Sequence, residues 1–234
     1  MRSPDDLLRV WVDYYRSLKE SYLIPNEYVL RAFLGNYPNL SMSHDYAGAS
    51  VCDVSCGDGR NLVMLHKLGF ELYATEITQE VCDLTRAKLS SHSEHIKVEI
   101  RPGLNWSLPF DEGFFDYLLS WNACYYMRDE HADISEHIRE YARILKPGGY
   151  FICSVPSPGC FSLAGAEELG NDLIRIQTNS KWNMLNGSIY HRFSSFDDIE
   201  RKFGECFSNF RRCTIKDDCF GLPLEYFIFV CRKS

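Results

Sequence analysis

Hydrophobic and polar positions follow two different spacings along most of this chain. From residue 50 onward, short apolar runs are separated by longer segments in which apolar residues recur every three or four positions. Short apolar runs are typical of buried strands, and the longer spacing is typical of helices with one apolar face. Their alternation predicts a parallel sheet with crossover helices, which is an α/β fold.

The strands and helices of this region can be located from the same spacing. The expected strands lie at residues 50–54, 70–75, 95–101, 116–121, 150–155, 210–215 and 225–232. The expected helices lie at residues 62–68, 79–89, 135–145 and 195–203. Pro147, Gly148 and Gly149 end the third of these helices, because proline cannot continue a helix and glycine permits a tight turn.

Two other segments do not follow this alternation. Helices are expected before the sheet, at residues 5–21 and 26–34, and the first has apolar residues at helical spacing. We expect residues 1–49 to form a helical cap over the sheet edge beside a glycine-rich turn. Residues 157–187 have scattered Gly, Ser and Asn, which predicts an irregular segment. The sheet domain that follows this cap, residues 50–234, would therefore carry an insertion at about 157–190.

Length and charge exclude several classes of protein. A chain of 234 residues with 45% hydrophobic residues can bury a substantial core. The 25 Lys and Arg against 32 Asp and Glu disfavour a nucleic-acid partner, because phosphate backbones attract basic surfaces. No stretch reaches the ~20 apolar residues of a membrane span, so no membrane partner is expected. We expect a monomer or a homodimer.

The spacing of the ten cysteines indicates in which cellular compartment the protein works and whether it has a metal site. A chain of this size does not need disulfides to fold, and its first residues lack the apolar core of a signal peptide. Cys52 and Cys56 are the closest pair, and no CxxC spacing marks a metal site. We therefore expect reduced cysteines, a cytoplasmic location and no metal.

A glycine-rich turn between Asp53 and Asn61 joins the first strand to the first helix of the sheet. Gly57 and Gly59 permit a left-handed backbone, and they have no Cβ to keep a ligand away from the chain. The following helix offers unpaired N–H groups to an anionic group such as a carboxylate. Glu76 ends the second strand, where an acidic side chain accepts hydrogen bonds from both ribose hydroxyls of an adenosine.

Two further residues narrow the type of adenosine ligand. Dinucleotide-binding turns have a third glycine that seats the pyrophosphate, but Leu62 stands at that position. Asp58 adds a negative charge, which disfavours phosphates and suits a ligand with a sulfonium and an ammonium group. These residues favour S-adenosylmethionine over NAD, and they also disfavour an oxidoreductase on the same fold.

Four motifs, at residues 53–61, 76–77, 108–116 and 143–149, occur in an order that resembles a known family. Over residues 50–155 the chain is similar to class I S-adenosylmethionine-dependent methyltransferases of the small-molecule, methyltransferase-11/25-like type. The resemblance implies a doubly wound, Rossmann-like sheet of seven strands in the order 3-2-1-4-5-7-6. It also implies that strand 7 is antiparallel and that an N-terminal helical lid covers the cofactor.

The resemblance assigns cofactor contacts to the first two motifs. The matching positions are Asp53, Ser55, Cys56, Gly57, Gly59, Asn61, Glu76 and Ile77. Ser55 departs from the family pattern, D-x-G-C-G-x-G, in which the first glycine stands at this position. The family commonly has an acidic residue against the adenine amine, where this chain has Leu104. The Asn105 amide could accept from that amine and Trp106 could stack on the ring, although Trp106 could equally belong to the core.

The resemblance also brings two other segments to the cofactor. Residues 120–127, after the fourth strand, would lie beneath its methionine part and form the floor of the acceptor pocket. Trp121 and Asn122 are therefore expected cofactor contacts, and Tyr125 is a candidate catalytic residue. Residues 24–31 resemble a helix start that closes over the carboxylate end of the cofactor. Tyr22 and Arg31 are candidate contacts there, unless Arg31 lies on a solvated helix face.

The acceptor is the part of the function that the sequence specifies least. His191 precedes the last helix, where members of this fold turn back over the pocket, and could act as a general base. The alternative is a histidine that only bridges loop segments. The acidic balance and the aromatic N-terminus favour O- or N-methylation of a metabolite, a natural-product intermediate or a sugar. A tRNA or protein methyltransferase and a non-catalytic adenosine-ligand binding protein are the alternatives.

Overall fold

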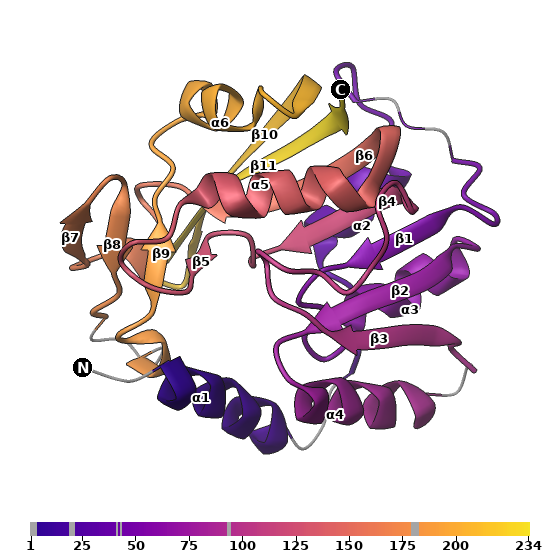
Figure 1. Cartoon of the computed structure of the whole chain (residues 1–234), viewed down its shortest axis with the longest axis horizontal. Helices are drawn as coiled ribbons and strands as arrows, with labels where there is room; N and C mark the ends of the chain where they lie inside the picture. Colours follow the sequence, from indigo (N-terminus) through magenta and orange to yellow (C-terminus); the bar gives the residue numbers. More distant parts are fainter. Residues whose placement is uncertain (1–3, 19–21, 41, 43, 93–94, 179–182) are drawn as a thin grey trace.

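A seven-stranded sheet forms the centre of the molecule, in the order β10-β11-β6-β4-β1-β2-β3 (Figure 1). Its strands are β1 (Ser50–Asp53), β2 (Glu71–Glu76), β3 (Val98–Pro102), β4 (Phe115–Trp121), β6 (Leu145–Pro156), β10 (Phe207–Cys219) and β11 (Leu222–Lys233). β11 is antiparallel to both β6 and β10, and the other neighbouring strands are parallel. The predicted α/β fold and its strand order are thus confirmed. The computed structural model describes residues 4–18, 22–40, 42, 44–92, 95–178 and 183–234.

Helices cover both faces of this sheet. Successive strand residues point to opposite faces, so Val51 and Leu119 pack in one hydrophobic cluster while Cys52 and Leu118 pack in the other. The first cluster includes residues of α2 (Glu27–Leu34), α3 (Arg60–Lys67) and α4 (Gln79–Ser90). The second includes residues of α5 (Ile134–Ile144) and α6 (Phe196–Phe203). The parallel strands therefore leave only their ends open for a binding site.

The two N-terminal helices lie in different places. α1 (Pro4–Ser17) lies beside α4, and Arg16 forms an ion pair with Glu80 there. It ends before the predicted limit of the first helix, and residues 19–21 of that prediction lie outside the described residues. α2 packs on the sheet instead, where Phe33 is fully buried against Phe70 and Tyr117. Only α1 lies over the glycine-rich turn.

A second, smaller sheet stands beside the main one. Its four strands run in the order β5-β9-β8-β7: β5 (Tyr126–Met127), β7 (Glu167–Gly170), β8 (Leu173–Arg175) and β9 (Ile189–His191). The prediction of an irregular segment at 157–187 was wrong for the part that forms β7, β8 and the short 3-10 helices η1 (Phe161–Leu163) and η2 (Asn183–Leu185). Gly170, Asn171 and Asp172 all have positive φ, so these small polar residues form the turn of a hairpin.

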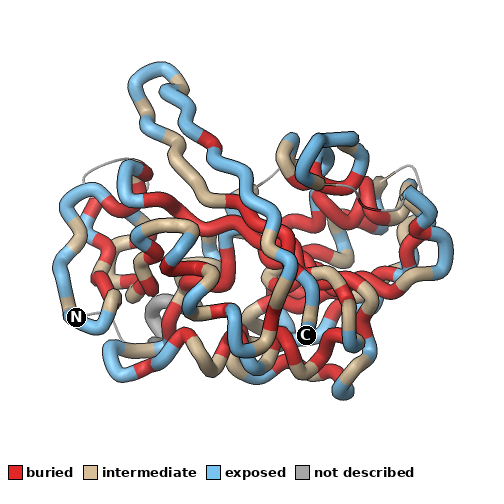
Figure 2. The backbone as a smooth tube through the Cα atoms, turned by 90° about the horizontal axis from the view of Figure 1, so that it is seen from above, coloured by how far each residue is buried: buried red, intermediate tan, exposed pale blue. Residues whose placement is uncertain are grey.

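The hairpin of β10 and β11 extends beyond the rest of the sheet. Figure 2 shows it as a long, mostly exposed arm. β10 is longer than the predicted strand at 210–215, because its exposed part has no apolar face that would mark it in the sequence. Phe220 and Gly221, at φ 52° and 86°, form the turn at its tip. Among the described helices, none has both the length and the hydropathy of a membrane span.

Candidate functional site

The turn between β1 and α3 has an unusual backbone. Ser55, Gly57 and Gly59 adopt φ values of 56°, 62° and 84°, all in the left-handed region. Glycine adopts this conformation without strain, whereas a serine is strained there. A Cβ added to Gly57 would lie 3.0 Å from the Tyr15 hydroxyl of α1. The Gly57 backbone therefore lies close to Tyr15 of α1, with little room between them for a side chain.

Glu76 connects this turn to the end of β2. Its Oε1 accepts a hydrogen bond from the Gly57 N–H at 2.7 Å, and its Oε2 accepts one from the Ile77 N–H at 2.9 Å. The Cys56 N–H donates to the Thr75 carbonyl at 3.0 Å, which holds the same two segments together. Each carboxylate oxygen has a second lone pair, so Glu76 can still accept one hydrogen bond at each oxygen.

Several acidic side chains are buried around the turn. Burial raises the pKa of Glu76 to about 6, although the two backbone N–H groups act in the opposite direction. Burial also raises the pKa of Asp53, and the nearby Glu76 carboxylate adds to this effect, whereas a hydrogen bond from Asn61 lowers it. Asp58 is buried as well and pairs with Arg60 at 2.9 Å. The turn is thus an acidic environment, which would attract a cationic ligand group.

Asn61 links this turn to the start of α2. Its side chain hydrogen-bonds to Asp53, and its Oδ1 accepts from the Asn26 N–H at 3.1 Å. Asn26 caps α2, because its own Oδ1 accepts from the Tyr28 N–H at 2.9 Å. The buried Asn61 therefore fixes both the first strand end and the chain that leads into α2.

The segment after β3 lies at the same edge of the sheet. Leu104 pairs with Ser107 in a tight turn, and this turn buries Asn105. The Asn105 Nδ2 donates to the Ala123 carbonyl at 2.9 Å, while its Oδ1 is buried and has no hydrogen-bond partner among the described residues. Trp106 lies with its ring centre 5.7 Å from that of His137. Asn105 therefore presents a free acceptor, whereas the Trp106 ring packs toward α5.

Comparison with known proteins identifies the domain that holds this site. Residues 52–153 match a family model described as a methyltransferase domain. Residues 52–153 therefore form a methyltransferase domain. This match confirms the resemblance seen in the four motifs.

Curated relatives match the methyltransferase domain and part of its surroundings. A ubiquinone biosynthesis O-methyltransferase of Xanthomonas oryzae pv. oryzae is 32% identical over 136 residues, which is 56% of this chain and 54% of the relative. A demethylmenaquinone methyltransferase of Listeria monocytogenes is 30% identical over 109 residues, which is 45% of this chain and 44% of the relative. The chain spans about half the length of the curated relatives it matches.

Solved structures share the fold of most of the chain. A SAM-dependent methyltransferase of Methanosarcina mazei superposes with a TM-score of 0.62 at 18% identity, over 85% of this chain and 98% of that one. A SAM-dependent methyltransferase of Aquifex aeolicus superposes with a TM-score of 0.58 at 15% identity, over 95% of this chain and 98% of that one. At these identities the likeness concerns the fold.

The methyltransferase domain presents groups that fit S-adenosylmethionine. The Asn105 Oδ1, which has no partner among the described residues, could accept from an adenine amine, and Glu76 could accept from two ribose hydroxyls. The buried Asp53 and Asp58 suit a ligand with positive charge. In the described part of the chain, no group of three or more His, Cys, Asp or Glu side chains could hold a metal ion. The expectation that no metal takes part remains a prediction.

The segment after β4 brings further predicted residues to this edge. Trp121 ends β4, and Asn122 follows with a φ of 57°. The Asn122 N–H donates to the Ser154 hydroxyl at 2.9 Å, which holds the strained residue in place. Tyr125 is buried and stacks on Tyr126, with ring centres 5.0 Å apart.

Two residues of α1 that lie at this site were not predicted as site residues from the sequence. Tyr15 lies against Gly57, and Trp11 lies between Tyr15 and Tyr126, with ring centres 6.0 Å and 5.7 Å away. Burial raises the pKa of Tyr15, and the Glu76 carboxylate raises it further. The signal was the aromatic composition of the apolar face of α1, since a helix that only packs would more often have aliphatic residues there.

Three predicted residues lie away from this group. The Tyr22 side chain is 82% exposed, and the exposed Arg31 pairs with Glu27 at 2.7 Å. His191 neighbours Tyr190 on β9, so the two side chains point to opposite faces of the small sheet. The His191 ring instead lies 4.7 Å from that of Phe193.

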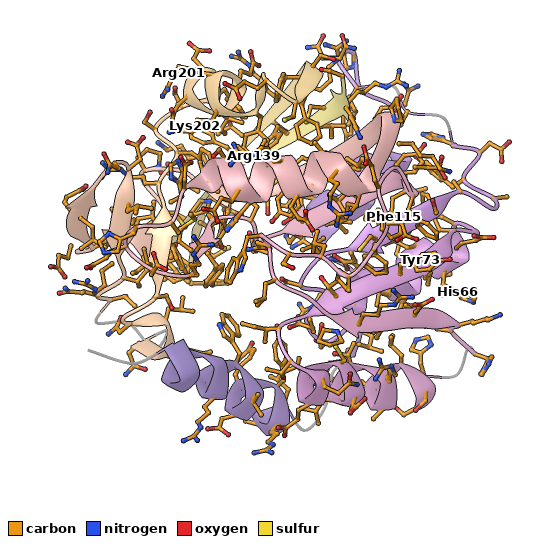
Figure 3. All side chains as sticks on the ribbon, in the orientation of Figure 1. His66, Tyr73, Phe115, Arg139, Arg201 and Lys202 are labelled. Carbon is orange, nitrogen blue, oxygen red and sulfur yellow. The ribbon has the colours of Figure 1, made fainter. Side chains whose placement is uncertain are left out.

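His191 lies on the side of the molecule that holds α5 and α6. Burial lowers its pKa to about 4, and Lys202 of α6, labelled in Figure 3, acts in the same direction. Its Nε2 is buried without a hydrogen-bond partner among the described residues. His66, another histidine labelled in Figure 3, lies in the last turn of α3, at the far end of the main sheet from the glycine-rich turn. Neither histidine lies beside Glu76 or Asn105.

Proposed function

We propose that this chain catalyses S-adenosylmethionine-dependent methyl transfer to an O or N atom of a small molecule. The observation that carries the proposal is the buried Glu76, whose two carboxylate oxygens bond the Gly57 and Ile77 N–H groups and keep a lone pair each. The match to a methyltransferase domain supports it. Since the chain matches only part of its relatives, the activity of the whole protein is part of the proposal.

The role of each residue follows from where its polar atoms lie. Glu76 would hold the ribose, the Asn105 Oδ1 would accept from the adenine amine, and the backbone at Gly57 would adjoin the amino-acid part. The bound cofactor supplies a methyl group on a positively charged sulfur. The chain's own contribution is to orient the two reactants and to exclude water, for which the rings of Trp11 and Tyr15 over the turn are suited.

A small-molecule acceptor is supported by two independent observations. The two relatives described above are named for methylation in ubiquinone and menaquinone synthesis, and these names concern small molecules. The net charge of −7 disfavours a nucleic-acid acceptor, which would be drawn to a basic surface. A small molecule, such as a metabolite, a natural-product intermediate or a sugar, is therefore the acceptor class that we propose.

Calorimetry with S-adenosylmethionine, S-adenosylhomocysteine and NAD tests the cofactor assignment. We expect the first two to bind and NAD not to bind. Glu76→Ala should weaken binding by about 1–3 kcal/mol, because the ribose hydroxyls lose their buried acceptors. Glu71→Ala is the matched control, since Glu71 is an exposed residue of the same strand. Tight binding of NAD alone, or equal affinity in Glu76→Ala, would contradict the proposal.

A further inference from the structure

β10 forms one edge of the main sheet, and its only strand neighbour among the described residues is β11. From residue 211 to the end of β10 this pairing is regular, and residues 211–218 are exposed except for Ile215. Figure 2 shows this part of the strand within the exposed arm. Alternate residues of a strand turn their backbone N–H and C=O groups to opposite sides, so this edge has backbone groups that a further strand could bond.

The charges along this edge are arranged by sign. Arg211 and Arg212 lie toward the body of the sheet, and Asp217 and Asp218 lie toward the tip of the arm. Edge strands commonly use charged side chains to prevent pairing with other chains. When two copies of this edge run antiparallel, however, the positive end of each lies opposite the negative end of the other. The edge is therefore complementary to itself.

Part of this charge has no partner within the chain. Arg212 forms ion pairs with Asp197 and Glu200 of α6, at 3.0 and 2.7 Å. The Arg211 guanidinium instead donates only to the carbonyl of the residue before it, at 3.2 Å. Asp217 accepts only from a cysteine thiol two residues further on, at 3.7 Å. Among the described residues, Arg211 and Asp217 thus have no ion-pair partner.

The positions of Arg211 and Asp217 determine one register between two copies. In an antiparallel pair formed by a two-fold axis, residues directly opposite each other point to the same face of the sheet. Arg211 and Asp217 are six positions apart, an even number, so their side chains also point to one face of β10. If the axis passes at Thr214, midway between them, Arg211 of each copy lies opposite Asp217 of the other. Two ion pairs form, and the two Thr214 side chains make a favourable cross-strand pair.

The remaining side chains are compatible with this register. Arg212 lies opposite Lys216, but these like charges are offset within each chain, since Lys216 pairs with Glu225 at 3.3 Å. Phe220 at the tip of the arm is fully exposed. In this register the turn that holds Phe220 lies at the same end of the interface as the half-buried Phe210 of the second copy. An apolar ring at each end would then flank the charged pairs.

We propose that the outer edge of β10 is an interaction surface for a second copy of this chain, and that the two edges pair antiparallel about Thr214. The two main sheets then join into one continuous sheet across a two-fold axis. The contact forms backbone hydrogen bonds along both edges and leaves neither exposed. The ends of β1, β2 and β4 remain open, because these strands are separated from β10 by β11 and β6.

Exchange of the two charges tests the proposal, with sedimentation velocity of the full chain as the measurement. We expect the wild type to be a dimer. Arg211→Glu and Asp217→Arg should each weaken dimerisation about tenfold or more, because each places like charges opposite each other at two positions. The variant with both changes should dimerise as the wild type does. Lys97→Glu is the matched control, since it makes the same change of charge at an exposed residue next to β3, the other edge of the sheet.

Thr214→Cys tests the register. The two copies of a residue on the axis have their Cα atoms about 4.5–5.5 Å apart, which is within the range of a disulfide. Mild oxidation should therefore join the two chains of this variant on a non-reducing gel. Lys216→Cys is the control, because its two copies would be about 14 Å apart along the strands. The native Cys213 is also too far from its copy, so the wild type should stay uncrosslinked.

The outcomes separate the proposal from other modes of association. Loss of the dimer in both single variants, with recovery in the combined variant, would support it. A monomeric wild type, or a dimer that neither single variant weakens, would overturn it. A dimer that Lys97→Glu dissociates would place the contact at the other edge and would overturn it as well. If the melting temperature shows that Arg211→Glu does not fold, Thr214→Cys still decides, and the absence of a crosslink there would refute the pairing.

Discussion

At the scale of single residues, the buried carboxylate of Glu76 decides how the site responds to pH. It has no cationic partner among the described residues, and only the Gly57 and Ile77 N–H groups offset its burial. Its pKa is raised from 4.5 to about 6, which means that ionisation costs the folded state about 2 kcal/mol above pH 6. The same ionised form is the one that can accept from two ribose hydroxyls.

Glu76→Gln should therefore separate stability from binding. In the wild type, stability falls as pH rises from 4.5 to 6, because the folded state holds the proton more tightly than the unfolded chain. The variant should lack this fall of about 2 kcal/mol in urea unfolding. Its S-adenosylhomocysteine affinity should be weak at every pH, whereas the wild-type affinity should rise between pH 5 and 7. A wild-type stability that does not change across this window would contradict the assignment.

Ser55 stands where the motif that the chain resembles has a glycine, and its φ of 56° lies in the left-handed region that favours glycine. Ser55→Gly should stabilise the protein by up to about 1 kcal/mol, because it removes the left-handed strain. The Ser55 N–H, which donates to the Thr75 hydroxyl, is retained in the variant. Ser91→Gly is the control, since Ser91 has a φ of −80° and should gain nothing. A loss of stability in Ser55→Gly, measured by urea unfolding, would refute the strain.

The sequence predicted those site residues whose positions are determined by the strand or turn in which they lie. Gly57, Gly59 and Glu76 lie at strand ends, where the chain direction alone determines their neighbours. Tyr15 was not predicted as a site residue. Its contact with Gly57 joins two segments that are distant in the sequence, and no sequence pattern indicates that they meet. The sequence also does not show on which face of the three-residue strand β9 the His191 side chain lies.

At the scale of elements, the two N-terminal helices pack against different parts of the fold. α1 contributes Trp11 and Tyr15 to the region over the turn, whereas α2 is part of a hydrophobic cluster of the main sheet. The apolar spacing in the sequence predicted both helices but not their different partners, because an apolar face does not specify what it packs against. Only the structure distinguishes a covering helix from a core helix.

Two adjacent residues of α2 test this difference. Phe33→Ala should cost about 3–5 kcal/mol of unfolding free energy, because it removes a fully buried ring that contacts Tyr46, Phe70 and Tyr117. Leu34→Ala should cost within about 0.5 kcal/mol, since Leu34 is 43% exposed. Denaturant unfolding of both variants measures the contrast. Equal small losses would mean that α2 is not part of the core.

At the scale of the whole molecule, the strand order determines where the site lies. β1 and β4 are central neighbours in the sheet, and the chain leaves them toward opposite faces, to α3 and α5. The ends of these two strands and of β2 therefore meet at one edge, which is where α/β sheets bind ligands. The sequence predicted this order through its resemblance to a family. It did not predict the small sheet, because strands of two to four residues have too few positions to show an alternation.

A crystal structure of the protein with S-adenosylhomocysteine tests the central claim most directly. We expect the ligand to lie at the turn between β1 and α3, with both ribose hydroxyls donating to Glu76 and the adenine amine donating to the Asn105 Oδ1. A ligand bound elsewhere, or one bound at this edge without contact to Glu76, would contradict it.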